Sequence, residues 1–425
     1  MKVLIKKAKI IAPKSAHHLQ TLDIWVKDGR IAEIGQNINQ KADQVIEGQN
    51  LHVSGGFLDL RCFSQDPGQE SMESLNSLTH AAAKGGFTEV VVMPNTTPIM
   101  QHKEGLAYLM SYSKYTLTTL SVAAAVTKDT DGKDFTEMWD LKNAGAVAFT
   151  DGSKPLWNSD ILFKTLQYLY PKNALLMNRA EEPTLAVFGQ MHEGITSTSM
   201  GTKGIPSEAE EIMVMRDLKL LEYANLSSET PLLHFSCIST AAAVKLIKKA
   251  KANGLAVSCD IAAHQLAFTD EDLVDFDTNL KVSPPFRSRK DIKALQKGLE
   301  EGTIDAIVTD HHPLDEEHKN LEFDLAYAGI IGLQTAFSVA NTYSGLNTEQ
   351  LVEKLVDAPR RILRKPMLDI SEGQAAELTV FDPTADFILT EKDIVSLSKN
   401  TPFINKPLKG KVIATLNKDQ ISINQ

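Results

Sequence analysis

The chain has 425 residues, of which 43% are hydrophobic, so it can fill a sizeable core in one large domain or in two to three ordinary ones. Its formal net charge is −10, and acidic and basic residues are mixed along the whole length. This balance argues against a nucleic-acid-binding surface and against a polybasic membrane patch. Small polar molecules or other proteins are the expected partners.

The opening stretch "MKVLIKKAKIIAPKS" contains two short, lysine-flanked apolar runs with alternating character. This pattern predicts β-structure rather than the continuous apolar core of a signal peptide. No apolar run approaches the ~20 residues that a membrane-spanning helix needs. The three cysteines are widely separated, which fits a reducing compartment. We therefore expect a cytoplasmic protein that binds neither nucleic acid nor membrane.

Three segments differ in their hydrophobic pattern. Residues 1–54 contain short alternating strands, with Asp28-Gly29 as a hairpin signal. Residues 55–365 alternate apolar strands such as "EVVVMPN", "PLLHFSC" and "DAIVTDHH" with helical stretches such as "TAAAVKLIKKAKANG" and "RKDIKALQKGLEEG". Residues 366–425 return to short strands. The pattern predicts an α/β fold in which a (β/α)8 TIM-like barrel is flanked by a small β-sandwich domain made from both termini.

Functional groups of such a barrel gather at the carboxyl ends of its strands. The first strand is followed by the stretch from Asp59 to Asp66 in "GGFLDLRCFSQDPG". Later strand ends carry further polar or reactive side chains, namely Asn95, Asp151, Arg179, Glu181, His234, Cys237, Asp310, His311 and His312. A site is therefore expected at this end of the barrel.

Ordered motifs along nearly the whole chain resemble the dihydroorotases of the amidohydrolase superfamily, specifically the longer, multifunctional or transcarbamoylase-associated type. "GGFLDLRCFSQDPG" is similar to Pro-Gly-Phe-Ile-Asp-x-His-x-His-Leu-Arg-Glu-Pro-Gly, and "HFSCIST" to His-x-x-His-Ile-Ser-Thr. The other matching motifs are "MPNTTP", "AFTDG", "VSPPFRS", "TDHHP" and "SKNTPF". The resemblance implies a barrel of the metal-dependent hydrolase type and, for members with an intact site, hydrolysis of a cyclic amide.

The resemblance also implies a zinc site with six ligand positions. The first-strand histidine pair of the family falls on Arg61 and Phe63, and the middle-strand histidines fall on Arg179 and Cys237. Only the acidic positions, Asp151 and Asp310, keep a ligand type common to the family. Asp310 is thus a retained catalytic position that we expect to be without function.

Arginine stays protonated and has no lone pair to donate, and phenylalanine has none either. Asp151, Asp310 and Cys237 form a conceivable zinc set only if both arginines swing away, because zinc needs three or four protein ligands. The simpler hypothesis is that Arg61 and Arg179 replace the metal and pair with Asp151 and Asp310. We therefore expect no cofactor, with zinc only under the alternative of a remodelled site.

The substrate-binding positions that the resemblance implies change in parallel. Gln65, Ser283 and Leu314 stand where the family has arginine, asparagine and histidine. Losing the arginine removes a charge-assisted bidentate contact to a carboxylate. Only Asn95 matches the family, so it is a possible substrate contact, although it is equally compatible with a plain turn.

Several neighbouring residues are better interpreted as structural. We expect Asp59 to hold the strand-end loop, the histidines 311 and 312 to orient or cap theirs, and His234 to be a hydrogen-bonded core residue. His264 is interpreted as structural, although the family also has a histidine there. Cys62 should point away from the barrel axis, because it alternates with Arg61 and Phe63. The segment 315–322, in the family's mobile loop, is predicted to be solvated.

Three functions remain open from the sequence. The first is a non-catalytic subunit or scaffold for aspartate transcarbamoylase in pyrimidine biosynthesis, which also forms a homo-oligomer. The second is an active dihydroorotase, or a related cyclic amidohydrolase, with a remodelled metal site. The third is a sensor that binds an anionic pyrimidine precursor without transforming it.

Overall fold

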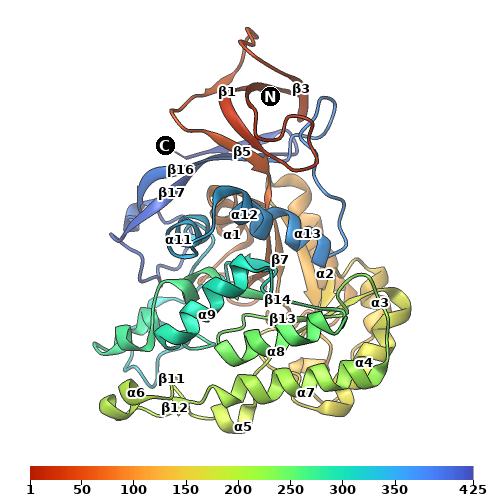
Figure 1. Ribbon diagram of the computed structural model, residues 1–425, viewed down its shortest axis with the longest axis vertical. Helices are drawn as coiled ribbons and strands as arrows, with labels where there is room; N and C mark the ends of the chain where they lie inside the picture. Colours follow the sequence, from red (N-terminus) through yellow and green to blue (C-terminus); the bar gives the residue numbers. More distant parts are fainter. Residues whose placement is uncertain (425) are drawn as a thin grey trace.

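The computed structural model describes residues 1–424 and contains two large sheets (Figure 1). One is an eight-stranded parallel sheet that curves into a barrel. The other has eight strands from both ends of the chain and is mostly antiparallel. The second sheet includes residues from both ends of the described chain, from Lys2 to Ile423, and lies at the top of the view in Figure 1. The expected fold class, a barrel flanked by a β unit from both termini, is confirmed.

The barrel strands follow one another in chain order around the sheet. They are β6 (Phe57–Cys62), β7 (Phe87–Val92), β8 (Thr119–Ala124), β9 (Ala148–Phe149), β10 (Leu175–Arg179), β13 (Leu233–Ser236), β14 (Val257–Ala262) and β15 (Ala306–Val308). The first and last strands meet where Cys62 bridges His311 in parallel and the amide of Phe63 donates to the carbonyl of His311 at 2.8 Å. These contacts close the barrel next to the predicted site.

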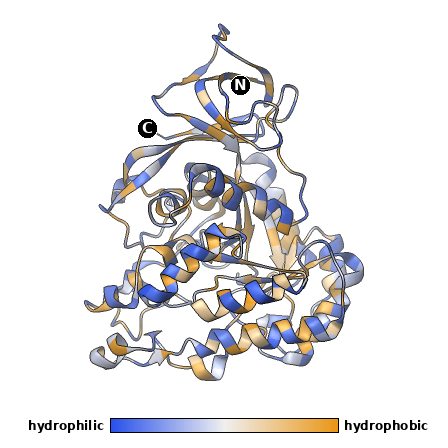
Figure 2. Cartoon of the chain, in the orientation of Figure 1, coloured by the Kyte–Doolittle hydropathy of each residue, from blue (hydrophilic) through white to orange (hydrophobic). Residues whose placement is uncertain are grey.

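Helices cover the barrel, and each presents one apolar face to the strands. They alternate between hydrophobic and hydrophilic residues in Figure 2. The longer ones are α1 (Leu75–Lys84), α2 (Lys103–Tyr112), α4 (Ser159–Leu169), α7 (Glu208–Ala224), α8 (Ala241–Ala252), α9 (Arg289–Glu300) and α11 (Ala336–Tyr343). Side-chain caps fix some starts: Thr240 accepts from the amide of Ala243 before α8, and Ser288 forms a capping box before α9.

Shorter helices fill the connections. They are α3 (Met138–Asn143), α5 (Pro183–Ala186), α6 (Ile195–Met200), α10 (Glu316–Lys319), α12 (Thr348–Val352) and α13 (Ala358–Ile362). The short strands β11 (Met191–His192) and β12 (Gly204–Ile205) pair in parallel beside α5 and α6. Within residues 1–424, no helix combines the length and apolar character that crossing a membrane requires.

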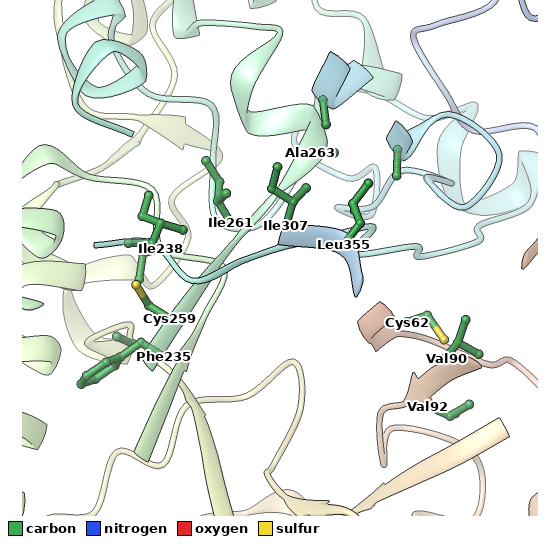
Figure 3. Packing of buried hydrophobic residues seen from close by; sticks show 14 of the residues in the cluster. Cys62, Val90, Val92, Phe235, Ile238, Cys259, Ile261, Ala263, Ile307 and Leu355 are labelled. Atoms are coloured by element: carbon green, nitrogen blue, oxygen red, sulfur yellow. The ribbon is translucent and has the colours of Figure 1, made fainter. Parts of the chain in front are cut away.

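Two apolar clusters lie on opposite faces of the barrel strands. Phe63 and Cys237 belong to the cluster inside the barrel. Cys62 belongs to the cluster between the strands and the helices, where it lies beside Val90 and Val92 (Figure 3). Cys62 therefore points away from the barrel axis, as its alternation with its neighbours predicts.

The terminal sheet joins the two ends of the chain through β5 (His52–Gly55) and β16 (Leu378–Ile388), where Val53 is paired with Val380. Its other strands are β1 (Lys2–Ile11), β2 (Thr21–Lys27), β3 (Arg30–Gly35), β4 (Gln44–Ile46), β17 (Pro407–Asn417) and β18 (Gln420–Ile423). Asp28 and Gly29 both have positive φ in the β2–β3 hairpin, which confirms the predicted turn. The terminal sheet thus contributes no strand to the barrel mouth.

Candidate functional site

A buried ion pair lies at the end of the barrel where the strands' carboxyl ends meet. Arg61 is the penultimate residue of β6 and is 1% exposed, and its Nε donates to Oδ1 of Asp310 at 2.8 Å. Both Nη atoms reach the carbonyl of Gly152 at 3.3 Å, and the guanidinium lies 5.0 Å from the ring centre of Phe63. The expectation that the two arginines pair with the two retained aspartates is thus met by Arg61, whose partner is Asp310.

Asp151, the second retained acidic position, has different partners. Its Oδ1 accepts from the amides of Val126 and Thr127 at 3.0 and 2.9 Å, and its Oδ2 accepts from the Thr127 hydroxyl at 2.5 Å. Burial raises the pKa of this carboxyl to about 6, although these hydrogen bonds act in the opposite direction. Asp151 therefore fixes the loop after β8 and is not paired with either arginine.

Arg179, at the end of β10, contradicts the other half of that hypothesis. Its Nη2 binds Glu181 at 2.6 Å and contacts the hydroxyl of Ser283, and its Nη1 donates to the carbonyl of Ser153 at 3.0 Å. The expectation that Arg179 pairs with one of the retained aspartates is wrong, because backbone amides already bind Asp151 and Arg61 binds Asp310, while Glu181 lies only two residues from Arg179. Sequence inspection placed Glu181 at a strand end but missed it as this partner.

Cys237 lies inside the barrel, and its surroundings keep it protonated. The side chain is 3% exposed, and burial raises the pKa of the thiol well above its usual range. Its backbone amide donates to Oδ1 of Asp260 at 2.6 Å. Zinc is bound by thiolates, so a thiol held in its neutral form is a poor ligand.

Asp260 is a central polar residue that the sequence analysis missed. Its Oδ2 contacts Nε2 of His234 at 2.8 Å, and Nδ1 of His234 contacts the Ser258 hydroxyl at 2.8 Å. His234 is thus a hydrogen-bonded core residue, as predicted. The available signal was a single acidic residue within the mostly apolar strand "LAVSCDIA", because a buried carboxylate needs partners.

Asp59 also has the structural role that was expected. It is fully buried in β6 and accepts hydrogen bonds from the amide of Thr309 at 3.0 Å, from the Thr309 hydroxyl at 2.5 Å and from the amide of Arg61 at 3.3 Å. Burial raises the pKa of its carboxyl to about 7, against these hydrogen bonds. The residue joins the first strand to the end of the last.

The positions implied for substrate are occupied by protein contacts. The side-chain Nδ2 of Asn95 donates to the carbonyl of Asp151 at 3.1 Å, and its Oδ1 accepts from the backbone amide of Ser153 at 2.9 Å. Gln65 donates to the carbonyl of Pro313 at 3.0 Å, and Leu314 is buried. Asn95 therefore holds the turn that also receives Arg61.

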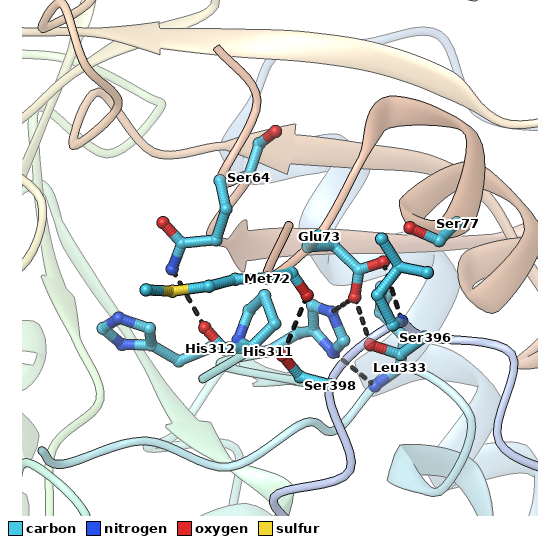
Figure 4. Close-up of polar contacts among 12 residues, drawn as sticks. Ser64, Met72, Glu73, Ser77, His311, His312, Leu333, Ser396 and Ser398 are labelled. Atoms are coloured by element: carbon cyan, nitrogen blue, oxygen red, sulfur yellow. Dashed lines mark hydrogen bonds and ion pairs between the residues drawn. The ribbon is translucent and has the colours of Figure 1, made fainter. Parts of the chain in front are cut away.

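The two histidines after Asp310 serve different contacts. The His312 ring stacks on Phe63 with 4.3 Å between ring centres, and burial lowers the pKa of His312 to about 4. His311 contacts Glu73 at 3.4 Å, and Glu73 also accepts from the Ser396 hydroxyl (Figure 4). Glu73 has no exposed surface and was missed from the sequence, where it stands in an ordinary polar stretch before α1.

The segment that follows is more ordered than a solvated loop. Asn400 accepts from the amide of Leu314 at 3.1 Å and donates to the carbonyls of His312 and Gly329 at 2.9 and 3.1 Å. Lys319 at the end of α10 is buried and donates to the carbonyl of Tyr327 at 3.0 Å. The prediction for 315–322 is therefore wrong at Lys319, because the segment forms a helical turn that folds back on itself.

His264 is buried and lies edge-on to Phe286, with 5.8 Å between ring centres. Burial lowers its pKa, so the neutral ring is favoured. Its Nε2 has no hydrogen-bond partner within residues 1–424. The ring packs as a core side chain, in agreement with the structural interpretation.

The residues present do not fit the zinc site that the family resemblance implies. In the described part of the chain, no three His, Cys, Asp or Glu side chains converge in a group that could hold a metal ion. Arg61 binds Oδ1 of Asp310, and both oxygens of Asp151 accept hydrogen bonds from the loop after β8. A cationic side chain beside Asp310 also repels a divalent ion.

Comparisons with known proteins identify the family. A family model described as "Dihydro-orotase-like" matches residues 51–266. The dihydroorotase of Pelotomaculum thermopropionicum is 36% identical over 98% of this chain and 97% of its own length. That of Acetivibrio thermocellus is 37% identical over 100% of this chain and 99% of its own length.

The chain belongs to the dihydroorotase-like family. Its fold is also that of the L-hydantoinase (dihydropyrimidinase) from Arthrobacter aurescens, with a TM-score of 0.82, 22% identity and coverage of 100% of this chain and 97% of the other. A structure titled D-hydantoinase has a TM-score of 0.80 at 19% identity. The dihydroorotase-like barrel is thus retained, while an arginine–aspartate pair stands at its mouth.

Proposed function

We propose that this chain is a non-catalytic member of the dihydroorotase-like family that acts in pyrimidine biosynthesis as a subunit or scaffold of aspartate transcarbamoylase. The observation that carries the proposal is the buried ion pair between Arg61 and Asp310. Hydrolysis of a cyclic amide needs an activated water and a Lewis acid or other oxyanion stabiliser. The only retained carboxylate at the mouth that is not bound by backbone amides is neutralised by a guanidinium.

A second observation supports the loss of substrate binding. Asn95, the one substrate position that matches the family, uses both ends of its amide on the 151–153 turn. Arg179 is likewise engaged by Glu181 and Ser283. Arg179, the cationic side chain of this pair, therefore already has protein partners in the place of a substrate carboxylate.

The scaffold role rests on a different argument. The similarity to dihydroorotases extends over 98% of this chain, which supports a role that depends on the whole fold rather than on the site alone. Aspartate transcarbamoylase is the partner that the resemblance to the transcarbamoylase-associated type implies. Fold-level analogy supplies the identity of this partner, and a binding experiment tests it.

The test uses the purified full-length chain. Zinc content is determined on the same sample that is assayed for dihydroorotase activity in both directions, and the sample is then mixed with aspartate transcarbamoylase of the same organism and analysed by gel filtration. A metal-free, inactive chain that co-elutes with the transcarbamoylase supports the proposal. Stoichiometric zinc with turnover that is lost in Asp310→Asn refutes the non-catalytic role, and separate elution refutes the scaffold role.

A further inference from the structure

The outer face of α7 carries a regular stripe of exposed residues. They are Glu208, Ile212, Met215, Lys219 and Glu222. The spacing of four, three, four and three residues is that of a seam between two packed helices. The opposite face of α7 is buried against the barrel. The helix therefore presents a second packing surface that nothing in the chain covers within residues 1–424.

Further apolar side chains are exposed on α7 and on the neighbouring excursion. Met215 is 54% exposed, and Tyr223 at the end of α7 is 73% exposed. Phe188 and Ile195, in the α5–α6 excursion next to α7, are 79% and 89% exposed. In Figure 1, α5, α6 and α7 lie together along the lower edge, away from the terminal sheet. These side chains add exposed apolar residues on α7 itself and on the excursion that contacts α7 through α5.

The charges of the stripe fit a second, antiparallel copy of the same helix. In an antiparallel seam, positions that alternate at spacings of four and three face each other in layers. One register places Ile212 opposite Met215 of the second copy, and Met215 opposite its Ile212. The same register places Glu208 opposite Lys219 at both ends. Two apolar layers are then flanked by two pairs of opposite charge.

The contacts that Lys219 and Glu208 make within the chain leave both side chains available to a second copy. Lys219 contacts Glu222 of its own helix at 2.8 Å, but both side chains are largely exposed, and such pairs contribute little. Glu208 forms no ion pair with any residue from 1 to 424. A groove of about 580 Å³ beside α7, lined by Lys219, Leu220 and Leu246 among others, can receive side chains of the second helix.

We propose that α7 pairs with α7 of a second copy of this chain about a twofold axis between residues 213 and 214. The interface is isologous, so each contact occurs twice. Phe188, Ile195 and Tyr223 extend the helix pair toward the area that a stable interface needs, about 800 Å² per partner. This pairing is separate from the proposed loss of catalysis and holds for an active or an inactive barrel.

The test is charge reversal, read by light scattering during gel filtration of the full chain over a range of concentrations. Lys219→Glu and Glu208→Lys each place like charges at both ends of the seam, so each should raise the dimer dissociation constant about tenfold or more. The double variant Glu208→Lys/Lys219→Glu exchanges the charges and should restore the native constant. The control Lys293→Glu changes an exposed lysine on α9 and should have no effect.

A native dimer that is weakened by both single variants and restored by the double variant establishes the pairing. A native chain that stays monomeric overturns it. A dimer dissociation constant that neither single charge reversal changes also overturns it. So does a double variant whose dissociation constant stays above the native value. Circular dichroism of each variant checks that the fold is unchanged, and these exposed positions give no reason for a variant to unfold.

Discussion

Arg61 and Asp310 lie 249 positions apart in the sequence, and their side chains meet at 2.8 Å inside the barrel mouth. One comes from the first barrel strand and the other from the turn after the last, so the pair fastens the two strands that close the barrel. Both side chains are buried, and their charges depend on each other in a region of low dielectric constant.

Removing one partner should therefore be costly. Arg61→Met leaves the Asp310 carboxylate buried without its cation, and we expect it to lower the free energy of unfolding by about 3–5 kcal/mol. Urea denaturation followed by circular dichroism measures the change. Lys164→Met, which breaks the exposed pair with Asp160, is the control and should cost less than about 1 kcal/mol.

The double variant Arg61→Met/Asp310→Asn distinguishes a broken pair from lost packing. It removes both charges, so it should be more stable than Arg61→Met alone. Equal stability of the single and double variants would show that the ion pair does not account for the loss.

The raised pKa of Asp59 predicts that the free energy of unfolding depends on pH. Its pKa in the folded chain is raised to about 7 by burial, above the value of about 3.9 in an unfolded chain. The folded state holds the proton more tightly than the unfolded state. The contribution of Asp59 to the free energy of unfolding therefore falls as pH rises from about 4 to about 7 and is constant above that range. At 1.36 kcal/mol per pKa unit, the span corresponds to roughly 4 kcal/mol at most.

Asp59→Asn should remove this part of the pH dependence. The difference in free energy of unfolding between variant and native chain is expected to change in favour of the variant from pH 4 to pH 7. Urea titrations at several pH values measure it. Asp151, Asp217 and Asp357 also have raised pKa values and remain in both proteins, so only the difference reports on Asp59. A difference that does not vary with pH would contradict the prediction.

The barrel and its seven later strands were predictable because periodicity is a local property. Stretches such as "EVVVMPN" and "LAVSCDIA" are apolar over the length of one buried strand, and each corresponds to a strand of the barrel. Turn chemistry was equally local, as Asp28 and Gly29 demonstrate. The position of Asp310 at a strand end followed from the alternation of strands and helices, and this brought it within reach of Arg61.

The remaining contacts depend on distances that no local pattern encodes. Arg179 could have paired with either of two acidic residues, Glu181 or Asp151. It binds Glu181 because backbone amides of the loop after β8 already bind Asp151. Asp260 was hidden in an apolar strand, although its burial made partners necessary. Glu73 meets Ser396 across more than 300 residues of chain. Such pairs appear only when the barrel closes.

Asn400 provides a test of the segment near the mouth. Asn400→Ala removes three hydrogen bonds to backbone groups, on Leu314, His312 and Gly329. We expect a loss of about 1–3 kcal/mol in the free energy of unfolding and faster amide exchange in residues 312–329. Hydrogen exchange with mass spectrometry locates the effect.

The control for that variant is Asn50→Ala, whose amide donates to the exposed Thr384 hydroxyl at 3.1 Å. It should change neither the stability nor the exchange of residues 312–329. Unchanged exchange in Asn400→Ala would show that other contacts, such as those of Lys319, suffice to hold the segment.

The departures from the family's ligand set can be reversed directly. The variant Arg61→His/Phe63→His/Arg179→His/Cys237→His supplies four neutral imidazoles and frees Asp310 from its guanidinium partner. Since the barrel strands hold these positions at one end, we expect the variant to bind about one zinc ion per chain, whereas the native chain binds less. Metal analysis after gel filtration measures the stoichiometry, and zinc should raise the melting temperature of this variant only.

The same four substitutions combined with Asp310→Asn form the control, because that change removes a carboxylate ligand without changing the size of the side chain. Zinc bound equally with and without Asp310 would place the metal elsewhere and would contradict the assignment of these positions.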